Sequence, residues 1–182
     1  EVRLGPGDRE PAARVVIDPI DGSMNVRRTI PSHSLSIAVA DGESMADVCF
    51  GFVHDFGAGD EFVAVRGEGA RLNGAPLGVD LPAQGLEVVG VESADPRWIL
   101  DAIAALRGAT YRLRIVGSVA ITLSYVAAGR FDAMISVRAC RSVEFPGFEL
   151  GEAMLDLDAR YPVIATLDHA HIETIRAAQK AA

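Results

Sequence analysis

Residues 18–23 (Asp-Pro-Ile-Asp-Gly-Ser) bring two carboxylates, a glycine and a hydroxyl together in one short segment. Because this segment follows an apolar run, two acids placed three residues apart cost free energy unless something neutralises them. The proline fixes φ and the glycine permits a tight turn, so Asp18, Asp21 and the carbonyl of Ile20 can face a common point. Such oxygen-only ligands suit a hard cation, with Mg²⁺ as the first candidate.

The end of the same segment is suited to a phosphate group. The Ser23 hydroxyl and the backbone N–H groups of Gly22 and Ser23 can hold a phosphate beside the metal. Taken alone, the residues leave two other interpretations open. In one, Asp21 only caps an Asx-type turn; in the other, Asp18 forms an aspartyl phosphate as a covalent intermediate.

Hydrophobic patterning predicts that the first half of the chain is mostly β-sheet. A continuous apolar run over residues 13–18 ends in an acid, which is typical of a buried strand that delivers a carboxylate at its end. Residues 34–40 alternate in polarity, and a glycine-rich turn at 57–60 separates the next two strands. The predicted strands are 13–18, 34–40, 47–54, 61–65 and 87–91.

The second half alternates helices with strands. Asp95 followed by Pro96 begins a helix, Ser118 caps a second helix that ends at Gly129, and Asp168 caps a final one. The predicted helices are 96–107, 118–129, 148–157 and 168–181, and the predicted strands are 111–116, 132–137 and 162–166.

Length and composition favour one α/β domain over residues 1–182, mainly antiparallel sheet in 1–92 and an α/β part in 93–182. A net charge of −8 argues against nucleic acid as the main partner, and no apolar run approaches the length of a membrane span. The two cysteines match no metal-binding spacing, so a reducing cytoplasm is expected.

Four motifs, in order along the chain, resemble those of the inositol monophosphatase family. Residues 16–25 (Val-Ile-Asp-Pro-Ile-Asp-Gly-Ser-Met-Asn) are similar to its first signature, and residues 67–74 (Gly-Glu-Gly-Ala-Arg-Leu-Asn-Gly) to its "G-x-G-A-x-x-N-G" hairpin. Residues 117–120 (Gly-Ser-Val-Ala) and 125–133 (Tyr-Val-Ala-Ala-Gly-Arg-Phe-Asp-Ala) resemble its "G-S-x-A" helix and the following strand. The resemblance implies the sugar-phosphatase fold of alternating helix and sheet layers. It extends to archaeal-type enzymes that also accept fructose 1,6-bisphosphate.

The resemblance also implies a role for each matching residue. Asp18, Asp21 and the Ile20 carbonyl would be metal ligands, and Ser23 would orient the attacking water. The turn that begins the "G-S-x-A" helix would line the hydroxyl side of the substrate, although Ser118 can equally be a plain helix N-cap. The implied substrate-binding residues in these motifs are Asp21, Gly22, Ser23, Gly117, Ser118 and Val119.

Two stretches depart from the family pattern. Glu144 stands where the family has the aspartate of a "W-D-x-A-A-G"-like segment, so it is either a metal and substrate ligand or an ordinary surface acid. Arg138 and Arg141 lie close to it in sequence, where they can select a bisphosphate or simply pair with acids. Glu1 matches the end of a "G-E-E"-like segment that supplies another metal-binding glutamate. We therefore expect the N-terminal helical layer to be missing or reduced.

The predicted function is a Mg²⁺-dependent phosphomonoesterase that hydrolyses inositol monophosphate, fructose 1,6-bisphosphate or both with a metal-activated water. The expected partners are a small phosphorylated polyol or sugar as substrate and a second copy of the chain in a homodimer. Two alternatives stay open: a catalytically impaired homologue that acts as a binding or oligomerisation module, and an adenosine 3′,5′-bisphosphate phosphatase.

Overall fold

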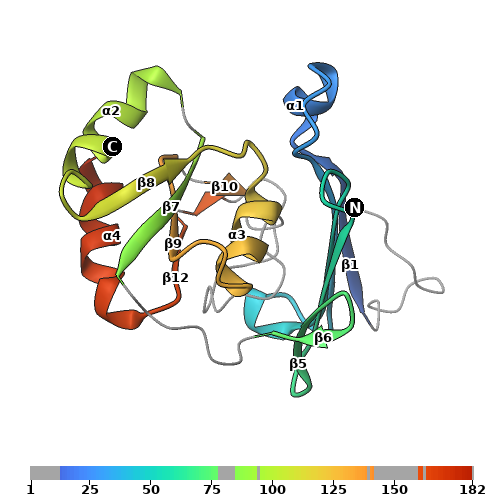
Figure 1. Cartoon of the computed structure of the whole chain (residues 1–182). Helices are drawn as coiled ribbons and strands as arrows, with labels where there is room; N and C mark the ends of the chain where they lie inside the picture. Colours follow the sequence, from blue (N-terminus) through green and yellow to red (C-terminus); the bar gives the residue numbers. More distant parts are fainter. Residues whose placement is uncertain are drawn as a thin grey trace.

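Helix α3 (Val119–Ala127) lies between two β-sheets in the computed structural model of the chain (Figure 1). The large sheet lies on one side of α3, the second sheet on the other, and helices α2 (Pro96–Ala105) and α4 (Ile172–Ala181) form the outermost layer beyond the second sheet. This confirms the expected alternation of helix and sheet layers. The structure describes residues 13–77, 85–93, 95–138, 140–141, 160–161 and 163–181.

The large sheet is an antiparallel meander whose strands follow one another in sequence order. The short helix α1 (Ser23–Arg27) lies in the connection between the first and second strands, and η1 (Met45–Asp47) lies between the second and third. The strands predicted at 34–40, 47–54 and 61–65 are confirmed, the first strand runs past its predicted end at Asp18, and the glycine-rich segment after 66 forms the hairpin. The strands of the large sheet are β1 (Arg14–Asp21), β2 (Ser34–Ala40), β3 (Val48–Asp55), β4 (Asp60–Val65), β5 (Gly69–Leu72) and β6 (Ala75–Pro76).

The two faces of the large sheet differ in the size of their side chains. Along β2, Ser34, Ser36, Ala38 and Ala40 are buried, whereas the large residues between them are only half-buried. Because successive side chains of a strand point to opposite faces, the small residues form the face towards α3. Small side chains there let the helix pack close to the sheet.

The second sheet has the strand order β12–β9–β7–β8. Strand β7 (Leu86–Glu92) pairs in parallel with β8 (Thr110–Arg114) and β9 (Ala133–Ser136), and β12 (Ile164–Thr166) joins β9 antiparallel. The α/β part therefore begins one strand before residue 93. A separate two-stranded pairing joins β10 (Cys140–Arg141) and β11 (Arg160–Tyr161).

Helix α3 is buried over most of its surface because it is covered by both sheets. Val119, Leu123 and Val126 pack with Met134 towards the second sheet, while Ala120 packs against the large sheet. Glycine is required at position 90 of β7, since a Cβ there would lie 2.4 Å from Cγ2 of Thr122. On the far side of the second sheet, Ile99 of α2 and Ile175 of α4 belong to one core cluster.

The predicted helix caps are confirmed at three places. Asp95 accepts a hydrogen bond from the Arg97 N–H, Ser118 from Ile121, and Asp168 from Ala170. The last of these begins a short 3₁₀ turn, η3 (His169–His171), that leads into α4. The helix predicted at 148–157 lies outside the described residues. Among the described helices, none combines the length and apolar character that crossing a membrane requires.

Candidate active site

A β-bulge in β1 brings Asp18 and Asp21 to the same face of the large sheet. Asp18 pairs with Ser36 and Asp21 with Ser34, so two residues of β1 stand opposite one residue of β2 between them. Without the bulge, a three-residue spacing would put the two carboxylates on opposite faces. Both serines are buried towards α3, so both acids lie on the α3 side of the sheet.

The sequence predicts that the strand stops at Asp18, whereas the structure continues it through Asp21. Pro19 has no N–H to contribute to the ladder, and this favours an irregular position at the bulge. The Asp18 carboxylate stabilises the bulge by accepting a hydrogen bond of 3.1 Å from the Ile20 N–H.

Gly22 makes the sharp turn from β1 into α1. Its φ of 89° lies in the left-handed region that favours glycine. A Cβ at this position would lie 2.9 Å from the carbonyl oxygen of Ser32 and 3.2 Å from that of Gly117. The turn expected to hold phosphate therefore sits directly against the turn that begins α3, although the two are far apart in sequence.

Asn25 fastens these two turns together. Its side-chain amide donates to the Ser32 carbonyl at 2.6 Å and to the Val116 carbonyl at 2.8 Å. Gly117, with φ of 79°, faces the same amide, and a Cβ there would lie 3.0 Å from Asn25 Nδ2. Sequence reasoning included Asn25 in the first motif without giving it a role. The signal available in the sequence was an amide side chain directly after the turn that was expected to bind a metal.

The carboxylate of Asp21 is held by the N-terminus of α3. Its Oδ2 accepts hydrogen bonds from the Ser118 hydroxyl at 2.6 Å and from the Ala120 N–H at 2.8 Å. The Ser118 hydroxyl also lies 3.2 Å from the Ser34 hydroxyl and accepts from the Ile121 N–H. The partly positive end of the helix favours the charged form of a carboxylate placed there. Ser118 is thus both the predicted N-cap and a direct partner of Asp21.

The remaining predicted residues differ in their exposure to solvent. Ser23, the first residue of α1, is exposed, as is Ile20. The side chain of Val119 packs in the core, so only its backbone is available to a substrate. Exposed Arg138 follows β9, and after Arg97 it helps to hold the pKa of Asp95 at about 2.

Three predicted residues cannot be placed in the site. Glu1 and Glu144 lie outside the described residues, and Arg141 is described only through its backbone in β10. The oxygen donors that are described, the Asp18 and Asp21 carboxylates and the Ile20 carbonyl, are of the kind that Mg²⁺ takes. Within the described ranges, no three His, Cys, Asp or Glu side chains cluster closely enough to hold a metal ion.

A buried acid that sequence reasoning missed lies behind the α3 N-terminus. Glu92, at the end of β7, is only 2% exposed, and its Oε1 lies 2.5 Å from the Thr122 hydroxyl and 3.3 Å from the Gly117 N–H. Burial raises the pKa of Glu92 to about 7, opposed by the Thr122 hydrogen bond and reinforced by the negative charge of Asp21. The signal available in the sequence was an acid at the end of an apolar strand, the pattern that drew attention to Asp18.

The raised pKa of Glu92 predicts that stability falls as the pH rises from about 4.5 to about 7. Over this interval the unfolded chain has lost the proton that the folded protein still holds, so the free energy of unfolding decreases with pH. A shift of this size corresponds to a loss of about 3 kcal/mol. Urea unfolding at both ends of the interval measures it. Glu92→Gln, which cannot ionise, should remove most of the slope; an unchanged slope would contradict the assignment.

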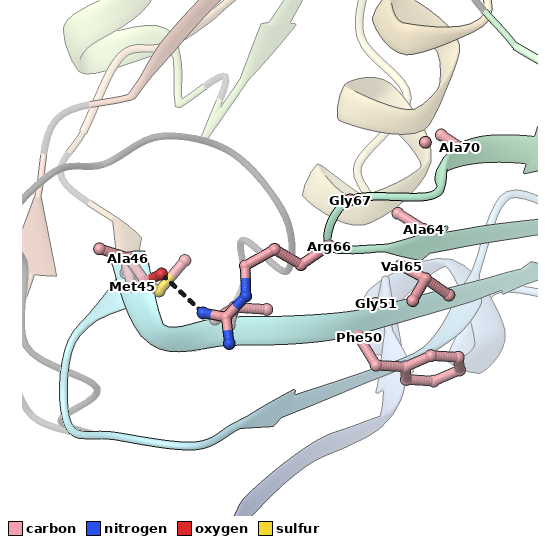
Figure 2. A pocket seen from close by; sticks show the side chains of 11 residues that line it. Met45, Ala46, Phe50, Gly51, Ala64, Val65, Arg66, Gly67 and Ala70 are labelled. Carbon is pink, nitrogen blue, oxygen red and sulfur yellow. Dashed lines mark hydrogen bonds between the residues drawn. The ribbon is translucent and has the colours of Figure 1, made fainter.

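A cavity of about 420 Å³ lies elsewhere on the large sheet (Figure 2). It is lined by residues of η1, β3, β4 and the start of β5, and Arg66 at its rim donates a hydrogen bond to the Ala46 carbonyl. None of the candidate residues lines it. Asp21 pairs with Ser34 of β2, and Ser34 pairs with Asp55, which lies at the end of β3 away from this cavity. The hydrogen-bonded centre around Asp21 and this cavity are therefore separate features of the large sheet.

Several known proteins resemble this chain in sequence. A Methanothermobacter thermautotrophicus fructose-1,6-bisphosphatase/inositol-1-monophosphatase is 34% identical over 141 residues, covering 71% of this chain and 48% of that protein. A Haemophilus influenzae protein named Nus factor SuhB is 32% identical, covering 79% of this chain and 57% of its own length. This chain therefore spans only about half the length of these relatives.

Structural comparison and family matching agree with these relatives. The solved structure of a Thermotoga maritima IMPase superimposes with a TM-score of 0.77 and 26% identity, covering 95% of this chain and 71% of that one. The family model described as "Inositol monophosphatase family" matches residues 3–143, which include the bulge, Gly22 and the α3 N-terminus. The chain belongs to the inositol monophosphatase family.

Proposed function

We propose that this protein is a Mg²⁺-dependent phosphomonoesterase that hydrolyses inositol monophosphate, fructose 1,6-bisphosphate or both by means of a metal-activated water. The observation that carries the proposal is the bulge, which sets Asp18 and Asp21 on one face beside the N-terminus of α3. Family membership supports phosphate-ester chemistry, and the name of the Methanothermobacter relative supports this pair of substrates.

In this proposal, Asp18, Asp21 and the Ile20 carbonyl hold Mg²⁺, with Glu144 and Glu1 as the further acids. The bound ion would neutralise charge on the phosphoryl oxygens and lower the pKa of a bound water. The Ser118 and Ala120 donors fix the orientation of the Asp21 carboxylate.

The turn after β1 would serve the phosphate. The N–H groups at Gly22 and Ser23 bind its oxygens, and the exposed Ser23 hydroxyl orients the attacking water. The Gly117–Ser118 turn faces the hydroxyl side of the substrate, and Arg138 or Arg141 would bind a second phosphate. These roles need no covalent intermediate.

Phosphate release tests the proposal directly. The full chain should release inorganic phosphate from inositol 1-phosphate or fructose 1,6-bisphosphate with Mg²⁺ present. Removing the metal with EDTA should abolish release, and added Mg²⁺ should restore it. Adenosine 3′,5′-bisphosphate serves as the third substrate, and exclusive turnover of it would shift the assignment. A folded chain that hydrolyses none of the three with Mg²⁺ would contradict the enzymatic function.

A second candidate is a catalytically impaired homologue that acts as a binding or oligomerisation module. It is supported by Glu144, which stands where the family has an aspartate, and by the relative named Nus factor SuhB. The two candidates differ in turnover, whereas a homodimer, which we also propose, is compatible with both. Light scattering coupled to size-exclusion chromatography gives the oligomeric state.

A further inference from the structure

Two carboxylates, one from each sheet, bracket the N-terminus of α3. Asp21 approaches from the large sheet and binds the Ser118 hydroxyl and the Ala120 N–H. Glu92 approaches from the second sheet and binds the Gly117 N–H and the Thr122 hydroxyl. Glu92 belongs to none of the four sequence motifs and is not among the proposed ligands.

Glu92 is held rigidly at the end of β7. Its backbone pairs with Ser136 of the parallel neighbour β9, and its carbonyl accepts a hydrogen bond of 3.1 Å from the Val137 N–H. The missing side chain at Gly90 lets Thr122 of α3 approach this strand closely. In sheets of this kind, ligands bind beyond the carboxyl ends of the parallel strands, which is where Glu92 lies.

The contacts of Thr122 indicate how Glu92 fixes the turn. The Thr122 hydroxyl lies 2.9 Å from the Ser118 carbonyl as well as 2.5 Å from Glu92 Oε1. A hydroxyl has one proton, and a carbonyl can only accept. Glu92 Oε1 accepts hydrogen bonds from the Gly117 N–H and from the Thr122 hydroxyl, whose single proton is shared with the Ser118 carbonyl. The amide oxygen of a glutamine can accept the same two hydrogen bonds.

We infer that Glu92 is a positioning residue of the active site, which sets the Gly117–Ser118 turn and, through it, the orientation of Asp21. This inference rests on the proposed function, because the turn matters to catalysis only if the substrate binds beside it. Glu92 contacts neither the expected phosphate position at Gly22 nor the exposed Ser23, so it acts through the turn.

A substitution series at position 92 tests the inference in the full chain. Glu92→Leu fills the space but removes the acceptor of the Gly117 N–H and one of the two acceptors of the Thr122 hydroxyl. It should lower kcat/KM for the ester substrate by roughly 10- to 100-fold, since a displacement near 1 Å of reacting groups costs about that much. Glu92→Gln should stay within about threefold of the wild type, because the amide oxygen of glutamine can accept the same two hydrogen bonds. Glu87→Gln, an exposed acid of the same strand, is the matched control.

The rescue by glutamine separates positioning from other roles. If Glu92→Gln loses as much activity as Glu92→Leu, the ionised carboxylate itself is needed and the inference is overturned. If Glu92→Leu keeps wild-type kcat/KM, the turn does not depend on Glu92 and the inference is again overturned. Thr122→Val, which removes the hydroxyl but keeps the shape, should give a smaller loss of the same kind and covers the case in which Glu92→Leu does not fold.

Hydrogen–deuterium exchange distinguishes failure of this inference from failure of the proposed function. In Glu92→Leu, the peptide spanning residues 115–122 should exchange faster than in the wild type, and in Glu92→Gln it should not. If the wild type hydrolyses no ester, the proposed function fails, but this exchange still reports whether Glu92 holds the turn. Unchanged exchange in Glu92→Leu would overturn the inference whether or not the protein is an active phosphatase.

Discussion

Asp18→Asn is expected to reduce Mg²⁺-dependent phosphate release about a thousandfold without unfolding the protein. The asparagine Oδ1 can still accept the hydrogen bond from the Ile20 N–H, so the bulge should persist. What is lost is one of the negative charges that would hold the ion. Several kcal/mol of charge stabilisation at a metal correspond to a rate change of this size.

The matched control for this substitution is Asp101→Asn. Asp101 is an exposed acid of α2, which lies on the far side of the second sheet. It should leave both the rate and the Mg²⁺ dependence unchanged. Initial rates across a Mg²⁺ titration, with circular dichroism to check folding, give the comparison. Asp18→Asn activity within about tenfold of the wild type would remove Asp18 from the metal site.

Gly22→Ala is expected to lose about 100-fold in activity and about 2 kcal/mol or more in stability. The left-handed φ of 89° strains any residue with a Cβ. The new Cβ would also press on the Ser32 and Gly117 carbonyls, which are backbone atoms that cannot rotate away. The turn at Gly22 and the turn that begins α3 must therefore move apart, which displaces both sides of the proposed substrate site.

Gly59→Ala separates these two contributions. Gly59 has a similar φ of 73° in the turn between β3 and β4, but a Cβ there meets nothing within 4 Å. It should cost only about 1 kcal/mol and leave activity unchanged. Urea unfolding and initial rates on both variants provide the measurement. Equal losses in the two variants would mean that the contact between the two turns is unimportant.

Much of the fold could be predicted from the sequence because its signals are local. Alternating polarity in 34–40, the glycine-rich turn at 57–60 and the caps Asp95 and Ser118 each act over a few residues, and each is confirmed. The first motif likewise identified the residues of the candidate site. The family assignment followed from the ordered motifs and is shown by the match over residues 3–143.

The errors in the prediction arise from strand pairing. The sequence ended the first strand at Asp18, whereas pairing with β2 extends β1 through Asp21 with a bulge. It also grouped β7 with the antiparallel half, whereas β7 lies parallel between β8 and β9. Register and partner depend on backbone groups far along the chain, which no local pattern encodes.

The residue types able to bind a metal and a phosphate, the strands and helices that carry them, and the family were determined by the sequence itself. Only the tertiary structure decided that Asp18 and Asp21 share a face, that Asp21 is held by Ser118 and Ala120, and that Glu92 supports the same turn from behind. The physical reason is that these hydrogen bonds join residues far apart in sequence. Asp21 and Ser118 are 97 positions apart, and Glu92 and Gly117 are 25 positions apart, so the bonds depend on how α3 packs between the two sheets. Residue chemistry is local, whereas the geometry of the site is set by that packing.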